Sequence, residues 1–174
     1  GIRDLIVTGV QTCALPIFLD ETAGGSSRLI VADDDDGIGL VSVSGEDSLL
    51  DAGQFLELGS GGGTATVNIS GGASLIADNA SIGNNAELNV SGPGTLMTFS
   101  NPTSPFANGV SVNGGLFKLD TGATLDGQGP DALINISGGR MEVRGGAQIN
   151  DTQHIILLLD GMGQDNLVID GIDT

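Results

Sequence analysis

A short alternating strand that ends in a glycine recurs six times along this chain. Each copy places two apolar residues around one intervening residue and closes on a small polar residue and glycine. The copies are VSVSG at 41–45, VNISG at 67–71, LNVSG at 88–92, VSVNG at 110–114, INISG at 134–138 and LLLDG at 157–161. Their glycines follow one another at intervals of 26, 21, 22, 24 and 23 residues. Repeats of this length are typical of solenoids, in which one repeat forms one coil.

The alternation predicts which side chains face the core. Every second residue of a strand points to the same face, so one face of each copy is apolar and the other carries Ser or Asn. The predicted inward set is Val41, Val43, Val67, Ile69, Leu88, Val90, Val110, Val112, Ile134, Ile136, Leu157 and Leu159. The predicted outward set is Ser42, Ser44, Asn68, Ser70, Asn89, Ser91, Ser111, Asn113, Asn135 and Ser137. Because only stacking in register buries the whole inward set together, the six copies are predicted to form one parallel sheet.

A second apolar run follows each glycine, and a third strand closes most coils. The second runs lie at 48–50, 74–77, 95–99, 116–119, 140–143 and 166–169. Glycines interrupt almost every window that could carry a helical period, and the repeat is too short for a strand-helix-strand crossover. The sequence therefore predicts an all-β parallel β-helix of about six to seven coils, with 20–26 residues per coil.

The formal net charge of −17 limits the partners of the chain. Nucleic-acid phosphates and anionic membrane surfaces would be repelled, and no apolar run has the length of a membrane span. We therefore expect neither nucleic-acid binding nor direct membrane insertion. The acidic balance favours solubility and association with cations.

Residues 1–17, GIRDLIVTGVQTCALPI, share nothing with the repeat. They resemble the translation of a DNA sequencing adapter, which implies that they are not native protein sequence. The expected division is an adapter-derived segment at 1–17 and a β-helix fragment at 18–174 that is open at both ends. Cys13, the only cysteine, lies in this segment, so no disulfide framework is expected in the rest.

Three motifs of the repeat resemble a known bacterial family. ISGGA at 69–73, Ile82-Gly83 and VSGPG at 90–94 occur in the order found in the type V secretion or PEP-CTERM associated repeat of autotransporter passengers. The resemblance covers roughly residues 38–150. It implies a right-handed β-helix at the cell surface or outside a Gram-negative bacterium, acting as a stalk, adhesin or passenger. It also implies a ligand on a host or environmental surface, and a translocation barrel or outer-membrane anchor downstream of this chain.

Two acidic segments are candidate calcium sites, because calcium takes oxygen ligands. The first is the run Asp33, Asp34, Asp35 and Asp36, which also fits a solvated acidic turn. The second is DGMGQDNL at 160–167, where Asp160 and Asp165 approach the pattern of a calcium-binding nonapeptide. That family shares each ion between successive copies, and a single copy also fits a plain strand corner. No other cofactor is expected.

The residues that could support catalysis are few. His154 is the only histidine and is expected on the solvent side of a strand. A polysaccharide-active β-helix enzyme would need basic and carboxylate side chains on one face, and the chain offers Lys118, Arg140, Arg144, Asp120, Asp126 and Glu142. Salt bridges on an outer strand face explain the same alternation, and there is no Trp or Tyr to stack a sugar. We therefore expect a non-enzymatic structural or adhesive segment, with the polysaccharide-active enzyme and a calcium-dependent binding module as alternatives.

Overall fold

The computed structural model describes residues 16–18, 27–100, 109–129, 132–150, 154–158 and 167–171, and its regular elements there are all strands. They form three parallel sheets of six strands each. Sheet A contains β3 (Ile38–Ser44), β6 (Thr64–Ser70), β9 (Ala86–Ser91), β12 (Leu116–Asp120), β15 (Arg140–Val143) and β18 (Leu167–Ile169). Sheet B contains β1 (Pro16–Phe18), β4 (Leu49–Asp51), β7 (Ser74–Ala77), β10 (Leu96–Ser100), β13 (Thr124–Gln128) and β16 (Gln148–Asn150). Sheet C contains β2 (Arg28–Val31), β5 (Phe55–Leu58), β8 (Asn79–Ile82), β11 (Val110–Asn113), β14 (Leu133–Ser137) and β17 (His154–Leu158).

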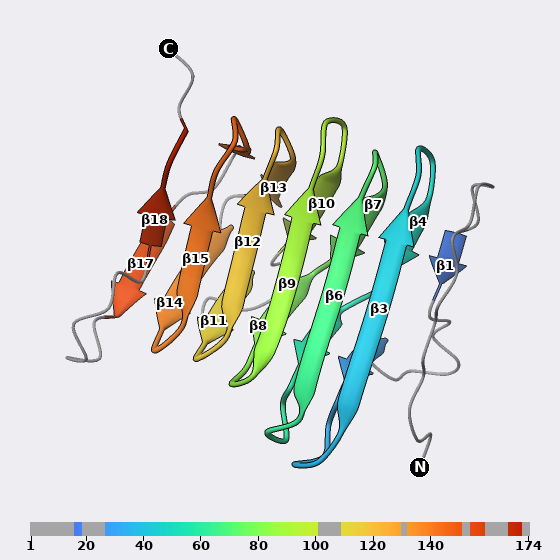
Figure 1. Cartoon of the computed structure of the whole chain (residues 1–174), viewed down its shortest axis with the longest axis vertical. Coiled ribbons are helices and arrows are strands. Elements are labelled where there is room, and N and C mark those ends of the chain that lie inside the picture. Colours follow the sequence, from blue (N-terminus) through green and yellow to red (C-terminus); the bar gives the residue numbers. More distant parts are fainter. Residues whose placement is uncertain are drawn as a thin grey trace.

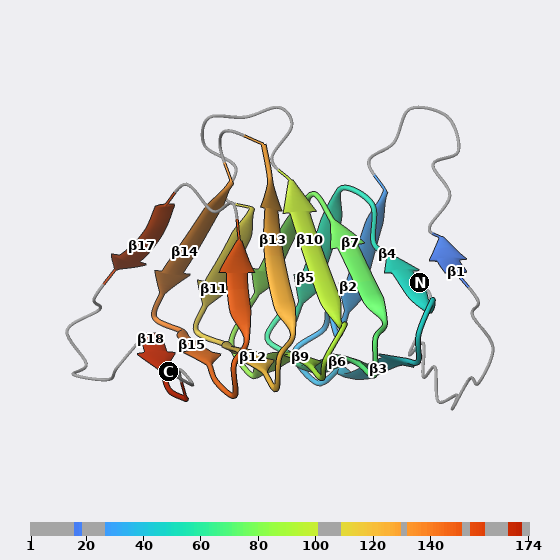
Figure 2. The same cartoon turned by 90° about the horizontal axis from the view of Figure 1, so that it is seen from above.

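The chain winds through the sheets in the order C, A, B and then repeats, which confirms the parallel β-helix (Figures 1 and 2). About five turns are complete, from β2–β3–β4 to β14–β15–β16, with β1 before them and β17 and β18 after them. This is fewer than the six to seven coils predicted. One coil is also longer than predicted, because the register pairs Ala80 with Val110, 30 residues further on.

The core lies inside the three sheets and is filled by the side chains that the alternation predicted. Every member of the predicted inward set from Val41 to Ile136 is buried, whereas the side chains of Leu157 and Leu159 lie outside the described residues. Phe99 and Phe117 are the largest fully buried side chains. Burial of an aliphatic side chain of this kind contributes roughly 1.5–3 kcal/mol before chain entropy is counted. The stacked core is therefore the main source of stability.

The outward prediction also holds, with one exception. Ser111 is buried, at 9% exposure. It lies on the outer face of sheet C in a hollow lined by the longer side chains of Phe55, Glu57 and Asn113. Its short side chain is therefore covered by its neighbours, although it points away from the core.

The prediction that the six glycine-terminated strands form one sheet is wrong. The first three copies lie in β3, β6 and β9 of sheet A, whereas the fourth and fifth lie in β11 and β14 of sheet C, and the described part of the sixth, residues 157–158, lies in β17 of sheet C. All six run parallel to their neighbours. The physical reason is that glycine begins both kinds of corner in these copies. Gly45, Gly71 and Gly92 begin corners from A to B, and Gly114 and Gly138 begin corners from C to A, so the same sequence signal marks two different corners.

At the corner from sheet C to sheet A, glycines of successive coils stack on one another. A Cβ on Gly83, Gly115 or Gly139 would lie 2.8, 2.4 or 2.8 Å from the carbonyl oxygen of the corner glycine one coil earlier. Real Cβ atoms do not approach backbone oxygen this closely, so these positions need glycine for close packing. These stacked glycines, which we call the glycine column, therefore allow successive coils to approach one another closely at this corner.

At the N-terminal end of the described chain, β1 pairs with β4, with Ile17 opposite Leu50. Pro16 and Ile17 belong to the segment that the sequence predicts to be foreign, and they extend sheet B by one strand. The rest of that segment lies outside the described residues.

Candidate functional site

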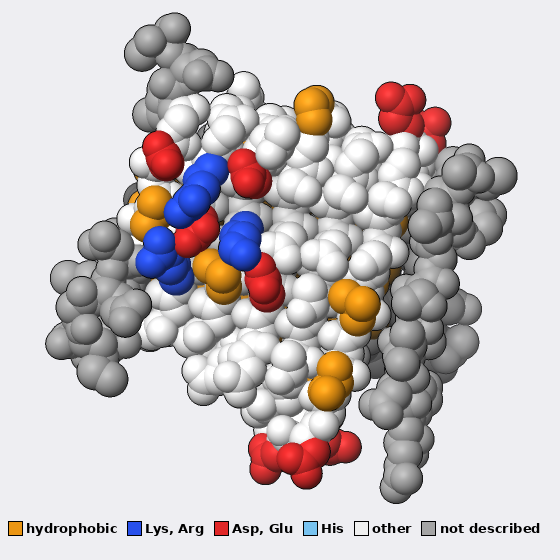
Figure 3. Space-filling view, in the orientation of Figure 1, with side chains coloured by type: hydrophobic (Ala, Val, Ile, Leu, Met, Phe, Trp, Pro, Cys, Tyr) orange, Lys and Arg blue, Asp and Glu red, His pale blue; other side chains and the backbone are white. Residues whose placement is uncertain are grey.

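The outer face of sheet A changes in character along the molecule, and Figure 3 looks onto it. The central row of outward side chains in register is Ser42, Asn68, Asn89, Lys118 and Glu142. In this central row the first three coils present uncharged polar groups, while the next two present charges. Figure 3 shows basic and acidic side chains interspersed over β12 and β15.

The uncharged half is a hydrogen-bonded ladder. Asn89 Nδ2 donates to Asn68 Oδ1 at 2.9 Å, and Asn68 Nδ2 donates to Ser42 Oγ at 3.4 Å. Both bonds join positions that are one coil apart, so the ladder exists only because the coils stack in register. It holds three half-exposed polar side chains in fixed positions on a flat sheet face.

The charged half is centred on Glu142. Its Oε1 lies 2.7 Å from Arg140 Nε, and its Oε2 lies 3.4 Å from Arg144 Nε. The contact between Arg140 and Glu142 is an ion pair but not a hydrogen bond, because the N–H of Arg140 Nε is not aligned with the carboxylate oxygen. Glu142 is 14% exposed, against 39% for Arg140 and 44% for Arg144. One shielded carboxylate thus holds two outer guanidinium groups side by side, an arrangement that we call the Arg–Glu–Arg triad.

Lys118 forms a second ion pair beside the triad. Its Nζ donates to Glu87 Oε1 on β9, and Lys118 itself lies opposite Glu142 of β15. Sequence reasoning missed Glu87 as a site residue, because 31 residues separate it from Lys118 and only the long coil brings the two together. No short-range motif marks such a pair.

The structure separates the predicted charged residues into two groups. Lys118, Arg140, Glu142 and Arg144 gather on sheet A, and Asp120 ends β12 there, where its Oδ1 accepts a hydrogen bond from the backbone N–H of Thr121 at 2.6 Å. Asp126 lies in β13 of sheet B and accepts a bond from Gln128 Nε2. The other basic residue in the described ranges, Arg28, lies on sheet C and pairs with Glu57 at 3.5 Å. It also lies over the ring of Phe55.

The first calcium candidate is an exposed turn between β2 and β3. Asp33, Asp34, Asp35 and Asp36 are all exposed. Asp33 Oδ1 accepts a hydrogen bond from Ser60 Oγ at 2.7 Å, and the Asp34 carbonyl accepts one from the N–H of Gly37. Within the described ranges no three His, Cys, Asp or Glu side chains are grouped so that they could hold a metal ion.

The other predicted site residues fall at the C-terminal end. Asp160 and Asp165 lie outside the described residues, so that calcium candidate stays a prediction. The backbone of His154 begins β17, while its side chain is not among those described.

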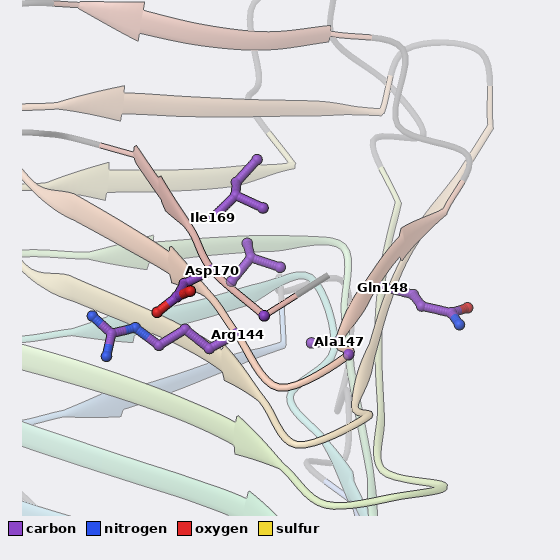
Figure 4. A pocket seen from close by; sticks show the side chains of 8 residues that line it. Arg144, Ala147, Gln148, Ile169 and Asp170 are labelled. Atoms are coloured by element: carbon purple, nitrogen blue, oxygen red, sulfur yellow. The ribbon is translucent and has the colours of Figure 1, made fainter. Parts of the chain in front are cut away.

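A hollow of about 370 Å³ lies beside the triad, between the last described corner and the end of β18. Figure 4 shows that Arg144 and Asp170 extend to one side of the ribbon and that Gln148 points to the other. The guanidinium of Arg144 therefore belongs to the outer face of sheet A and does not fill the hollow.

Comparison with known proteins gives no relative for this chain. No family model matches it, and neither a curated protein nor a solved structure does. In the part of the chain that the structure describes, no helix is long and apolar enough to cross a membrane.

Proposed function

We propose that this chain is a non-enzymatic structural or adhesive segment of a secreted or surface-displayed bacterial repeat protein. The observation that supports this most is the uninterrupted stack of parallel strands around one apolar core. Coils spaced at about 4.8 Å give five turns a length of roughly 25 Å. A stack of this kind holds its outer side chains at fixed heights along a rod.

The resemblance of the sequence to autotransporter passengers supports a cellular location for this rod. In this proposal it lies at the cell surface of a Gram-negative bacterium, associated with the outer membrane through a downstream barrel or anchor. Its ligand belongs to a host or environmental surface. The hydroxyl and amide groups on the outer face of sheet A support contact with a hydrated partner.

Antibodies raised against the purified chain test the location. We expect them to label intact cells of the source bacterium, and we expect external protease to remove the label without lysis. An antibody against a cytoplasmic protein serves as the control and should label only permeabilised cells. Labelling by the chain-specific antibody that also requires permeabilisation would contradict the proposal.

A polysaccharide-active enzyme is the second candidate, and the cluster on sheet A favours it. Lys118, Arg140 and Arg144 do meet two carboxylates on one face, as such an enzyme requires. Both carboxylates, however, are already ion-paired with the bases, which leaves neither as an unengaged proton acceptor. We therefore expect no release of unsaturated or reducing ends when the chain is incubated with polygalacturonate. Release that disappears in Lys118→Ala would establish the enzyme instead.

A further inference from the structure

The Arg–Glu–Arg triad differs from an ordinary surface salt bridge because one carboxylate serves two cations. Each oxygen of Glu142 is directed to the Nε of a different arginine. The side chains of Arg140 and Arg144 are thereby held on the same outer face of sheet A, four residues apart. Holding the side chains in advance lowers the entropy that a ligand must remove on binding.

The outer edges of the two guanidinium groups are available to a ligand. Arg140 and Arg144 each contact Glu142 through Nε, and in the described part of the chain neither arginine has an ion pair with any other residue. A guanidinium group has a planar fork of donors that matches a carboxylate in a bidentate pair. The chemistry of the exposed edge therefore selects an anionic group with two oxygens.

The charges decide how densely charged that ligand is. The triad has a net charge of +1, from two arginines and one glutamate, but Asp120 and Asp170 lie beside Arg144 in the two neighbouring coils, and the whole chain is at −17. A polymer with a charge on every unit would be attracted to the triad but repelled by the rest of the rod. A ligand with an isolated carboxylate fits this balance better.

The uncharged ladder supplies the second half of the recognition surface. Asn89 lies opposite Lys118, which lies opposite Glu142, so only one strand separates the ladder from the triad. At strand spacing this places Asn89 about 10 Å from Glu142. Amides and hydroxyls at this distance can bond the hydroxyls of a sugar whose carboxylate is held by the arginines.

We propose that the outer face of sheet A, from the ladder to the triad, binds a saccharide that contains a carboxylated sugar. The inference rests on the proposed surface role of the rod and names the class of ligand for it. Arg140 and Arg144 bind the carboxylate, and Asn68 and Asn89 bind sugar hydroxyls.

Titration calorimetry with matched saccharides tests the proposal. The acidic probe is 3′-sialyllactose, which has a single carboxylate, and its neutral counterpart is lactose; trigalacturonate, with a carboxylate on every unit, is the densely charged comparison. We expect the full chain to bind 3′-sialyllactose at least tenfold more tightly than lactose, and more tightly than trigalacturonate. Equal affinity for 3′-sialyllactose and lactose, or no binding of 3′-sialyllactose, would overturn the proposal.

Three variants assign the binding to the triad. Arg144→Gln should weaken binding of the acidic probe by about tenfold or more, as loss of a charge-assisted contact does. Arg144→Lys should restore only part of the affinity, because it keeps the charge without the fork. Arg28→Gln is the matched control, since it removes another ion-paired arginine from sheet C, and it should bind like the parent chain. If Arg28→Gln weakens binding as much as Arg144→Gln, the binding comes from non-specific electrostatic attraction and the proposal is wrong.

Thermal unfolding of each variant checks that the rod is intact, which we expect because Arg28 and Arg144 are both exposed. The outcome is separable from that of the proposed function. If the antibodies label the surface of intact cells but the chain does not bind 3′-sialyllactose, the proposed function stands and this inference is wrong. A chain that cleaves polygalacturonate would lose the proposed function even if it binds.

Discussion

At the scale of single residues, each strand separates an inner apolar set from an outer polar set. Ile136 is fully buried in β14, opposite Val112 of the coil before it. Asn135, the adjacent residue, is only half-buried on the outer face. The sequence alternation predicts this difference without the structure, because side chains in a strand alternate between its two faces.

Substitution at these two positions measures the difference. Ile136→Asp should lower the free energy of unfolding by about 4 kcal/mol or more, because it places an unpaired charge in the core. Asn135→Asp should cost less, about 1–2 kcal/mol, because residue 135 is half-buried on the outer face and the Oδ1 of Asn135 already lies buried without a hydrogen-bond partner. Urea denaturation of both variants checks the prediction, and equal midpoints would show that the two faces are wrongly assigned.

The candidate site could be predicted only in part, also at the residue scale. The alternation of Arg140, Glu142 and Arg144 predicts from the sequence that they share one face, and the structure places the first two in β15 and Arg144 directly after it, on the same face. The partner of Lys118 was not visible, since Glu87 lies on another coil and its proximity depends on the length of the connection. Residues separated by a variable loop cannot be paired from local spacing.

At the scale of strands and corners, the sequence predicts that strands exist and where they end, but not which sheet each one joins. The corner after β9 leads from sheet A to sheet B, while the corner after β11 leads from sheet C to sheet A. Gly92 directly follows β9 and Gly114 directly follows β11, and both glycines have positive φ. Identical local chemistry at the two corners leaves the assignment to the global register, which is shifted by the longer coil that pairs Ala80 with Val110.

The glycine column at the corner from C to A gives a prediction at this scale. Gly115→Ala should destabilise the chain by about 3 kcal/mol, because the new Cβ would meet the carbonyl oxygen of Gly83 at 2.4 Å. Gly129→Ala is the comparison, since a Cβ there meets nothing within 4 Å and only its φ of +96° is unfavourable. We expect a loss of about 1 kcal/mol at that position. Thermal unfolding that ranks Gly129→Ala as the more harmful change would refute the close packing of this corner.

At the scale of the whole molecule, the net charge of −17 dominates the response to ions. Divalent cations should stabilise the rod modestly through screening, with magnesium and calcium nearly equivalent. A built site at residues 33–36 or 160–165 would instead prefer calcium, which accepts more oxygen ligands in looser geometry. Thermal unfolding at constant ionic strength with each ion distinguishes the two cases. Stabilisation by calcium alone that disappears in Asp165→Asn would favour the calcium-dependent binding module.

The register of the solenoid decides both the fold and the site, because only in this register does Lys118 pair with Glu87 and lie opposite Glu142. It places Lys118 beside Asn89, whereas the glycine spacing alone would place Ser111 there. Neighbours on adjacent strands lie about 4.8 Å apart, within the range of a disulfide.

Engineered disulfides in a Cys13→Ser background measure this register directly. On oxidation, the pair Asn89→Cys with Lys118→Cys should crosslink within one chain, and the pair Asn89→Cys with Ser111→Cys should not. Electrophoresis without reductant, together with peptide mass analysis, detects the bond. Crosslinking of the second pair without the first would contradict the three-sheet register and the binding face built on it.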